Sequence, residues 1–476
     1  MTGTTPAPSV PTDRTKIVCT LGPSSATSEV IGSLLDAGMS VARINFSHGT
    51  HETHARTIAI VRQLAADRKR PVAILGDLQG PRIRIGDLES SVTVGPGDEV
   101  ILCDETTCSG TDLPVTYTDI ARDVKVGDRV LIDDGLIELV VLDIKAQRVV
   151  TRVLHGGEIR SHKGMNLPGV QVSAPSITDK DRADAKFAVE QRLDYLALSF
   201  VRRAEDLAAL RELIPKDLLV ISKIEKDSAL DDIESIIRAS DGIMVARGDL
   251  GVELPFEEVP LVQKRLIRLA NQLGRPVITA TQMLESMIEH PRPTRAEASD
   301  VANAILDGTD AVMLSAETAA GAYPELAVRA MRRIIAEIEK NGVSPRREER
   351  KAGLVGASTE ETIAVATRAA AVLLDAPLVV VFTKSGFSAR IVASQRPDVP
   401  ILGLTPVERT YNQLSLIWGV IPALGPPVDT YVKMFEYART EILQRSLAKV
   451  GDRVLVTAGV PFDVPGTTNL VKVEVV

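Results

Sequence analysis

The amino-acid sequence predicts an α/β protein: a (β/α)8 TIM barrel with an inserted all-β lid domain and a C-terminal α/β domain. Short apolar runs of strand length recur between segments of helical periodicity, which is the pattern of βαβ units and a parallel sheet. After the third run, the pattern changes to β-rich segments with Gly-Asp turns. A charged stretch near residue 350 then separates a last unit in which helices and strands alternate.

Eight of the apolar runs are expected to form the barrel. They cover residues 17–20, 41–46, 72–75, 195–200, 218–224, 242–246, 277–281 and 311–315. We therefore assign residues 15–79 and 174–345 to the barrel. Its second part opens with Ser and Thr followed by acidic residues at 176–181, which is typical of a helix start.

The remaining segments precede, interrupt or follow the barrel. Residues 1–14 are rich in Thr, Pro and Ser and predict a disordered tail rather than a signal peptide. Residues 80–173 lack a convincing helical segment and are assigned to the lid. After a charged linker at 341–356, residues 357–476 form the last domain. Its first expected elements are helices at 361–374 and 388–395 and strands at 378–382 and 401–404.

Composition argues against several classes of protein. A net charge of -8 disfavours nucleic acid as the main partner of these 476 residues. No apolar run is long enough to cross a membrane, since the longest candidate, at 369–382, contains Asp375 and Pro377. The three cysteines lack Cys-x-x-Cys and zinc-ligand spacing, so a reducing cytoplasm is the expected setting.

Two neighbouring strand ends concentrate the candidate chemistry. Lys223 and Glu225 are two positions apart on one run and therefore project from the same face of a strand. Asp249 follows the next run. If the two strands are parallel neighbours, two carboxylates and a lysine form a divalent-cation site with a cationic partner, which indicates phosphate or enolate chemistry. The structural alternative is a strand-end salt bridge and a turn.

Polar or charged residues end almost every expected strand. Because the carboxyl ends of barrel strands meet at one rim, we expect the active site there. The segments concerned are 43–49, 77–84, 199–202, 223–225, 247–249, 281–283 and 315–318.

Longer motifs resemble the pyruvate kinase family, in its bacterial form, along nearly the whole chain after the tail. They are Thr20-Leu-Gly-Pro23, Arg43-Ile-Asn-Phe-Ser-His-Gly49, Asp77-Leu-Gln-Gly-Pro81, Lys163-Gly-Met-Asn-Leu-Pro-Gly169, Met244-Val-Ala-Arg-Gly-Asp-Leu-Gly251 and the block from Ala280 to Leu314. The resemblance implies phosphoryl transfer from phosphoenolpyruvate to ADP, giving pyruvate and ATP in the last step of glycolysis. It also implies a cytoplasmic homotetramer that a phosphorylated metabolite activates.

The resemblance gives each site residue a role. Lys223 would be a fixed cation against the transferring phosphoryl group, Arg43 would hold the phosphate, and Thr281 would lie in the proton path. Glu225 and Asp249 would hold Mg2+ or Mn2+. The other implied substrate contacts are Ser199 and the N–H groups of Gly248 and Asp249, and the implied nucleotide contacts are Asn45, Ser47, His48, Arg84 and Lys163.

A monovalent-cation site is also implied, and here the chain departs from part of the family. Its implied ligands are Asn45, Ser47, Asp77 and Leu78. The potassium-dependent branch has an acid after the nearby Gly-Pro, whereas this chain has Arg82, and the potassium-independent branch has a lysine. We therefore expect the Arg82 guanidinium to make K+ dispensable. Ala320, where many relatives have lysine, and Thr53, where some have an aromatic residue near the adenine, are further departures.

The last domain contains a candidate effector loop after a strand and before a helix. Its hydroxyl and backbone N–H groups form a phosphate-cradling pattern, although an ordinary strand-to-helix turn would look similar. The residues are Thr383, Lys384, Ser385, Gly386 and Ser388. Because the loop at 459–469 has no basic residue, a sugar monophosphate or AMP is favoured over a bisphosphate.

Two other functions stay open on the sequence. One is another metal-dependent barrel enzyme acting on pyruvate enolates, such as a lyase or aldolase, against which the lid and the basic nucleotide-side residues argue. The other is a catalytically silent effector-binding protein, which the intact Lys223, Glu225 and Asp249 disfavour.

Overall fold

Eight parallel strands close into a barrel in the order β1-β16-β15-β14-β13-β12-β3-β2, which confirms the predicted fold class. Each strand ends within two residues of its prediction. The strands are β1 (Lys16–Leu21), β2 (Val41–Asn45), β3 (Ala73–Asp77), β12 (Tyr195–Leu198), β13 (Leu219–Ile224), β14 (Gly242–Ala246), β15 (Val277–Ala280) and β16 (Ala311–Leu314). The computed structural model describes residues 13–341, 358–427, 430–460 and 468–476, so residues 1–12 of the predicted tail, nearly all of the linker and part of the loop at 459–469 lie outside the described residues.

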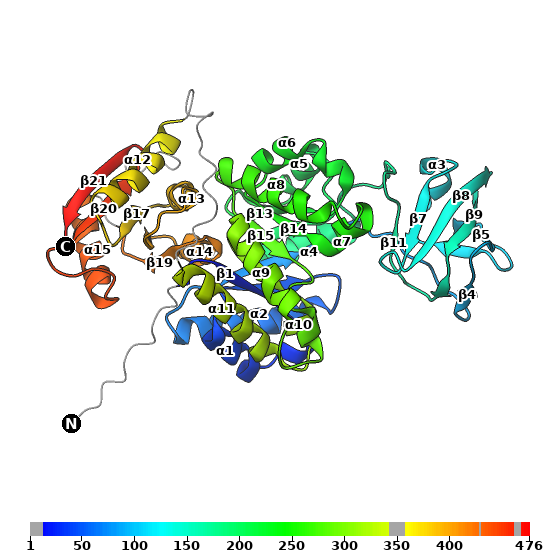
Figure 1. Cartoon of the computed structure of the whole chain (residues 1–476), viewed down its shortest axis with the longest axis horizontal. Coiled ribbons are helices and arrows are strands. Elements are labelled where there is room, and N and C mark those ends of the chain that lie inside the picture. Colours follow the sequence, from blue (N-terminus) through cyan, green and yellow to red (C-terminus); the bar gives the residue numbers. More distant parts are fainter. Residues whose placement is uncertain (1–12, 342–357, 428–429, 461–467) are drawn as a thin grey trace.

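Helices surround the barrel (Figure 1). The long ones are α1 (Ser28–Ala37), α2 (His51–Asp67), α4 (Asp179–Glu190), α8 (Val259–Gln272), α9 (Arg295–Asp307) and α11 (Pro324–Lys340), and the short ones are α5 (Glu205–Arg211), α6 (Ile233–Ala239), α7 (Arg247–Glu253) and α10 (Ala316–Ala319). Capping boxes begin α2, α4 and α9 at Thr50, Thr178 and Thr294.

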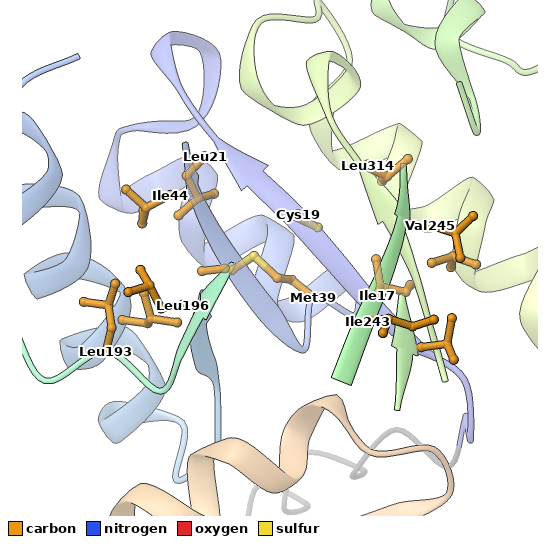
Figure 2. Close-up of a cluster of buried hydrophobic side chains, with 14 of the residues drawn as sticks. Ile17, Cys19, Leu21, Met39, Ile44, Leu193, Leu196, Ile243, Val245 and Leu314 are labelled. Atoms are coloured by element: carbon orange, nitrogen blue, oxygen red, sulfur yellow. The ribbon is translucent and has the colours of Figure 1, made fainter. Parts of the chain in front are cut away.

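Alternate side chains of the strands build two hydrophobic layers. Ile17 and Cys19 of β1 point outward and pack with Met39, Ile44 and Leu196 beneath the helices (Figure 2). Val18, between Ile17 and Cys19, belongs instead to the cluster inside the barrel. This packing fixes which residues at the strand ends project into the rim.

The lid lies at one end of the molecule and the C-terminal domain at the other (Figure 1). The lid has a six-stranded sheet, β11-β7-β8-β9-β5-β6, and a two-stranded sheet, β10-β4. Its strands are β4 (Val92–Val94), β5 (Glu99–Asp104), β6 (Leu113–Val115), β7 (Arg129–Ile132), β8 (Ile137–Lys145), β9 (Arg148–His155), β10 (Gly157–Ile159) and β11 (Met165–Asn166).

Two features of the lid were not predicted. A short helix, α3 (Ile120–Asp123), interrupts the β pattern, and at four residues it is too short to produce a periodic signal. Cys103 and Cys108 form a disulfide, which the reducing setting expected from the cysteine spacing did not predict, whereas Cys19 is a buried free thiol. Their spacing in the sequence matches none of the recognised motifs, so only the turn after β5 brings them together.

The C-terminal domain is a five-stranded sheet in the order β19-β18-β17-β20-β21, parallel except for β21. Its elements are α12 (Thr359–Leu373), β17 (Val379–Phe382), α13 (Phe387–Ser394), β18 (Ile401–Thr405), α14 (Glu408–Gln413), β19 (Val420–Leu424), α15 (Tyr431–Gln444), β20 (Arg453–Ala458) and β21 (Leu470–Val475). The four elements predicted at the start of this domain are all present. Among the described residues, no helix is long and apolar enough to cross a membrane.

The end of the predicted tail is ordered. The Arg14 backbone N–H donates to Glu339 of α11 over 2.8 Å, and the Arg14 carbonyl accepts from Gly419 over 2.9 Å. Asp13 pairs with Arg332. Asp13 and Arg14 are therefore held against α11, and Arg14 also ties the start of the barrel to the C-terminal domain, a role that tail composition could not indicate.

Candidate active site at the carboxyl rim of the barrel

Four charged side chains from three strands meet at the rim. Arg43, at the end of β2, contacts the Asp77 carboxylate of β3 through Nε at 2.7 Å and Nη2 at 2.6 Å. On β13, Lys223 Nζ lies 2.8 Å from Glu225 and 3.3 Å from Asp77. All four are largely buried, so each charge depends on the others to offset the loss of water.

The pKa shifts of this cluster follow from burial and pairing. Burial raises the pKa of Asp77, but Lys223 and Arg43 outweigh it and hold the pKa below its ordinary value. Burial lowers the pKa of Lys223, but Asp77 and Glu225 reverse this and raise it. Lys223 is therefore a permanent cation at neutral pH. Burial, and then the Asp249 charge, raise the pKa of Glu225 despite Lys223.

The segment after β12 holds Lys223 and Glu225 in place. Lys223 donates to Ser199 Oγ over 2.7 Å, and that hydroxyl donates to the Leu78 carbonyl over 2.7 Å. The N–H of Phe200 donates to Glu225 Oε2 over 2.7 Å. Phe200 adopts a φ of 55°, a conformation that points this N–H at the carboxylate.

The start of α7 faces Thr281. The Gly248 N–H donates to Thr281 Oγ1 over 2.8 Å, and this hydroxyl donates to the Ala280 carbonyl over 2.7 Å. A Cβ on Gly248 would lie 3.3 Å from Thr281 Oγ1, so glycine permits the close approach. Arg247 donates to the carbonyls of Thr281 and Gln282 and pairs with Asp300 at 2.6 Å.

Glu225 and Asp249 fit a divalent cation. Strands β13 and β14 are parallel neighbours, as predicted, and the two carboxylates are close enough for the charge of Asp249 to raise the pKa of Glu225. In the described part of the chain, the Asp249 carboxylate takes no hydrogen bond or ion pair. Two carboxylates supply hard oxygen ligands, and a cation between them would relieve their mutual repulsion. They therefore suit Mg2+, and substrate or water would fill its remaining coordination positions.

The predicted nucleotide-side residues lie on two separate elements. Asn45 Oδ1 accepts from the Ser47 N–H over 3.1 Å, and the His48 carbonyl accepts from His54 over 2.8 Å, which fixes the loop after β2. On the lid side, Arg84 donates to the His162 carbonyl over 3.1 Å, and Lys163 pairs with Asp133 at 2.8 Å. A bridge between Arg84 and Gly164 brings the two basic side chains to the same hinge.

In the described residues, Arg82 is not part of the cluster of paired charges that Arg43, Asp77, Lys223 and Glu225 form. It is exposed and lines a cavity that Asp249, Arg202 and Lys226 also line. In the ranges that the structure describes, no hydrogen bond or ion pair joins Arg82 to Asp77, whose carboxylate is already engaged by Arg43 and Lys223.

The candidate effector loop caps α13. Gly386 is the N-cap with a φ of 77°, which glycine adopts readily. The Lys384 carbonyl accepts from Thr410 over 2.7 Å, whereas Ser388 Oγ lies 2.7 Å from Thr468 and is buried. Thr383, the first residue after β17, is also buried. The Ser388 hydroxyl is thus part of the domain's internal packing.

Several residues that shape these sites were not singled out. Thr20 accepts from Arg43 Nη1 over 2.9 Å, and Glu253 accepts from Lys226 over 2.6 Å. Arg390 donates to the Ser385 carbonyl in the effector loop over 3.2 Å. Of these residues, only Thr20 could have been identified from the sequence, because it lies at a strand end within a motif that resembles the family.

Comparisons with known proteins agree with this geometry. The family model described as pyruvate kinase, barrel domain, matches residues 12–328, and the one described as pyruvate kinase, alpha/beta domain, matches residues 361–474. A pyruvate kinase from Geobacillus stearothermophilus is 46% identical over 97% of this chain and 80% of its own length. One from Staphylococcus aureus (strain MRSA252) is 45% identical with the same coverages.

A solved structure points the same way. The crystal structure of a pyruvate kinase from Cryptosporidium parvum matches with a TM-score of 0.90 and 37% identity, over 98% of this chain and 96% of the other. Sequence, fold and the charged rim therefore agree: the chain belongs to the pyruvate kinase family and is a phosphotransferase.

Proposed function

We propose that the protein transfers the phosphoryl group of phosphoenolpyruvate to ADP with Mg2+ or Mn2+, giving pyruvate and ATP, in the cytoplasm and as a homotetramer. The observation that carries this proposal is the buried cluster of Arg43, Asp77, Lys223 and Glu225 beside Asp249. It offers two fixed cations to a phosphate and two carboxylates to a metal. The relatives' name supports the same reaction.

The basic residues would stabilise the transferring group. A β-phosphate oxygen of ADP forms the new bond to phosphorus, while the bond to the enol oxygen breaks and leaves its electron pair on the enolate. Lys223 and Arg43 are already oriented by Asp77, so they can stabilise the charge on the equatorial oxygens without reorganisation. Mg2+, held by Glu225 and Asp249, would neutralise the charge that develops on the enol oxygen.

The start of α7 and Thr281 would handle the rest of the substrate. The N–H groups of Gly248 and Asp249, at a helix N-terminus, would receive the substrate carboxylate, with the Gly248 N–H shared between the substrate and Thr281 Oγ1. Thr281, with its hydroxyl fixed between Gly248 and Ala280, would pass a proton to the methylene carbon of the enolate. The double-bond electrons would form that C–H bond, giving pyruvate.

The lid residues Arg84 and Lys163 would contact the ADP phosphates, with the loop from Asn45 to His48 nearby. Lid closure would exclude water, which would otherwise take the phosphoryl group. We also propose that K+ is dispensable, because Arg82 adds a positive charge where K+-dependent relatives carry an acid.

The effector would be a phosphorylated metabolite at the loop formed by Thr383, Lys384, Ser385, Gly386 and Ser388, with the turn's backbone N–H groups as the main donors because the Ser388 hydroxyl is engaged by Thr468. A sugar monophosphate or AMP is favoured, because the sequence at 459–469 has no basic residue to hold a second phosphate. Activation that is strongest with a bisphosphate, in a titration of initial rates, would contradict this choice.

The test is the initial rate of pyruvate formation from phosphoenolpyruvate, ADP and Mg2+ in potassium-free buffer, before and after K+ is added. Strong turnover without K+ is expected. If turnover appears only after K+ is added, the proposed reaction stands but the proposal that Arg82 makes K+ dispensable is wrong. Pyruvate release that does not require ADP would instead indicate a lyase or aldolase, and no turnover with the activators present would contradict the enzyme assignment.

A further inference from the structure

Glu253 joins three elements of the site, yet the reaction leaves it without a role. Its Oε1 atom accepts from Lys226 Nζ over 2.6 Å and from Asn166 Nδ2 over 3.1 Å. The Glu253 side chain is fully buried and that of Lys226 is 14% exposed. Glu253 Oε2 is buried without a hydrogen-bond partner. A buried carboxylate is expensive to maintain, so this bridge is a specific feature of the fold.

The bridge connects the two segments that carry the metal-binding carboxylates. Lys226 directly follows Glu225 after β13, and Glu253 lies one helical turn beyond Asp249 on α7. The pair therefore fastens the far end of α7 to the residue next to Glu225. Moving one partner would change the distance between the two carboxylates.

Helix α7 depends on such contacts for its position. It has seven residues, and no side chain caps its N-terminus. Arg247 anchors the beginning of the helix to the Thr281 and Gln282 carbonyls, and Glu253 anchors its end to Lys226. Asp249 lies between these two anchors, so their geometry sets where its carboxylate points.

Asn166 extends the bridge into the lid. It belongs to β11, three residues after Lys163, on the strand that returns from the lid to the barrel. Asn166, Lys226 and Asp249 line one cavity with Arg82, so the segments that join the lid to the barrel share a boundary with Asp249.

We propose that Glu253 is a positioning residue that sets the spacing of Glu225 and Asp249 and couples this spacing to the lid through Asn166. This inference rests on the proposed function, since it takes those two carboxylates as the divalent-cation site. A purely structural ion pair would affect folding stability without changing metal affinity.

The first experiment measures Mn2+ binding by electron paramagnetic resonance, without substrates, in the wild type, Glu253→Gln and Lys226→Met. Both variants are expected to weaken Mn2+ about tenfold, which is typical when the partner of a metal ligand is lost. The double variant should bind like either single variant, because one bridge is lost in all three. Unchanged affinity within twofold in both single variants, or additive losses in the double variant, would overturn the proposal.

A matched control separates positioning from stability. Asp241→Asn removes the 2.5 Å pair with Arg211 at the amino end of β14, the opposite end of the same strands. Urea unfolding should show a loss of stability in this control, with Mn2+ affinity unchanged. If the control weakens Mn2+ as much as Glu253→Gln, the effect is general destabilisation and the proposal is wrong.

The lid coupling has its own readout. Mn2+ should slow tryptic cleavage of the wild type at the hinge residues Arg82 and Arg84, and Asn166→Ala should lose this protection while binding Mn2+ within twofold of the wild type. Equal protection in both proteins would overturn the coupling. Wild-type turnover is assayed in parallel: absent turnover with intact Mn2+ binding would contradict the proposed reaction and leave the positioning result standing.

Discussion

Three rim residues, Phe200, Thr281 and Gln282, adopt left-handed backbone conformations with φ of 55°, 65° and 52°. Each costs about 1 kcal/mol or more for a residue with a side chain, so a specific contact must maintain it. The Phe200 N–H is held by Glu225, whereas the carbonyls of Thr281 and Gln282 are held by Arg247. The backbone strain of these three residues is therefore offset by hydrogen bonds to charged side chains.

The first prediction concerns Arg247→Lys. Lysine keeps the charge and its pair with Asp300, but it cannot also donate to the carbonyls of Thr281 and Gln282. Thr281 would lose its fixed orientation, so we expect kcat to fall about 10- to 100-fold while the KM for phosphoenolpyruvate changes less. Steady-state kinetics measure both. Arg238→Lys, in an exposed pair with Glu234, is the control; equal effects in the two variants would contradict the prediction.

At the residue scale, the sequence predicted the charged groups better than their supports. The proximity of Lys223, Glu225 and Asp249 could be predicted, because strand periodicity and parallel pairing place them together from sequence spacing alone; their catalytic roles stay predictions. The Phe200 N–H was not found, because its role depends on a backbone φ that no residue type indicates. Glu253 was missed for a similar reason, since it lies at the end of α7 and its partner Lys226 lies in the segment after β13, and nothing in the local pattern relates them.

Among the elements, the turn after β5 in the lid is closed covalently by Cys103 and Cys108, five positions apart. Cys103 is fully buried beside Leu102 and Leu113, and Asp112 at the end of the same turn pairs with Arg148 of β9. The disulfide therefore fixes a turn that joins β5, β6 and β9.

The second prediction is that reduction loosens this part of the lid. Opening a disulfide that closes a loop of this length lowers the free energy of unfolding by about 2 kcal/mol, because the unfolded chain becomes less constrained. Amide hydrogen exchange of β5 and β9 should become faster in dithiothreitol, while exchange in the barrel strands stays the same. Cys108→Ala should exchange at the faster rate with or without the reductant. A further increase on reduction of this variant would show that the disulfide is not the cause.

The boundaries of strands could be predicted where apolar runs alternate regularly with polar segments along the chain. The barrel strands are buried on both faces and bounded by polar residues, so apolar runs give their positions within two residues. The helix α3 and the disulfide were not predictable, because both are products of a local turn geometry rather than of any periodic pattern.

Across the whole molecule, the barrel and the C-terminal domain share a buried polar junction. Arg396 makes two contacts with Asp310, at 2.9 and 3.0 Å, and its guanidinium lies 4.8 Å from the centre of the Trp418 ring. The Arg14 guanidinium also lies over this ring, 5.6 Å from its centre. Lys16 of β1 donates to the Val420 carbonyl of β19 over 2.9 Å.

The third prediction follows from Lys16. Burial lowers its pKa from 10.5 to about 8, against a weaker opposing effect of Glu339. Between these two values the unfolded chain binds more protons than the folded one, so stability rises as pH rises from about 8. Relative to Lys16→Met, the wild type should gain about 2 kcal/mol between pH 7.5 and 9.5 in urea unfolding. Parallel pH dependences of the two proteins would contradict this assignment.

The last prediction uses Trp418, the only tryptophan of the chain, as a reporter of the junction. Arg396 also donates to the Gly308 carbonyl and to Asn271, so a guanidinium satisfies four acceptor atoms at once. In Arg396→Lys the ammonium cannot reach all of them. Asp310 keeps the backbone N–H groups of Val277 and Trp418 but loses part of its charged pairing, which destabilises the contact between the domains. Trp418 fluorescence should then change at a lower urea concentration than the far-ultraviolet circular dichroism, whereas the two transitions should coincide in the wild type.

Arg453→Lys, at an exposed arginine on β20, is the control and should keep the two transitions coincident. Coincident transitions in Arg396→Lys would mean that the apolar surface alone holds the two domains together. Separated transitions would show that the Arg396–Asp310 pair is needed to hold the C-terminal domain on the barrel while each keeps its secondary structure.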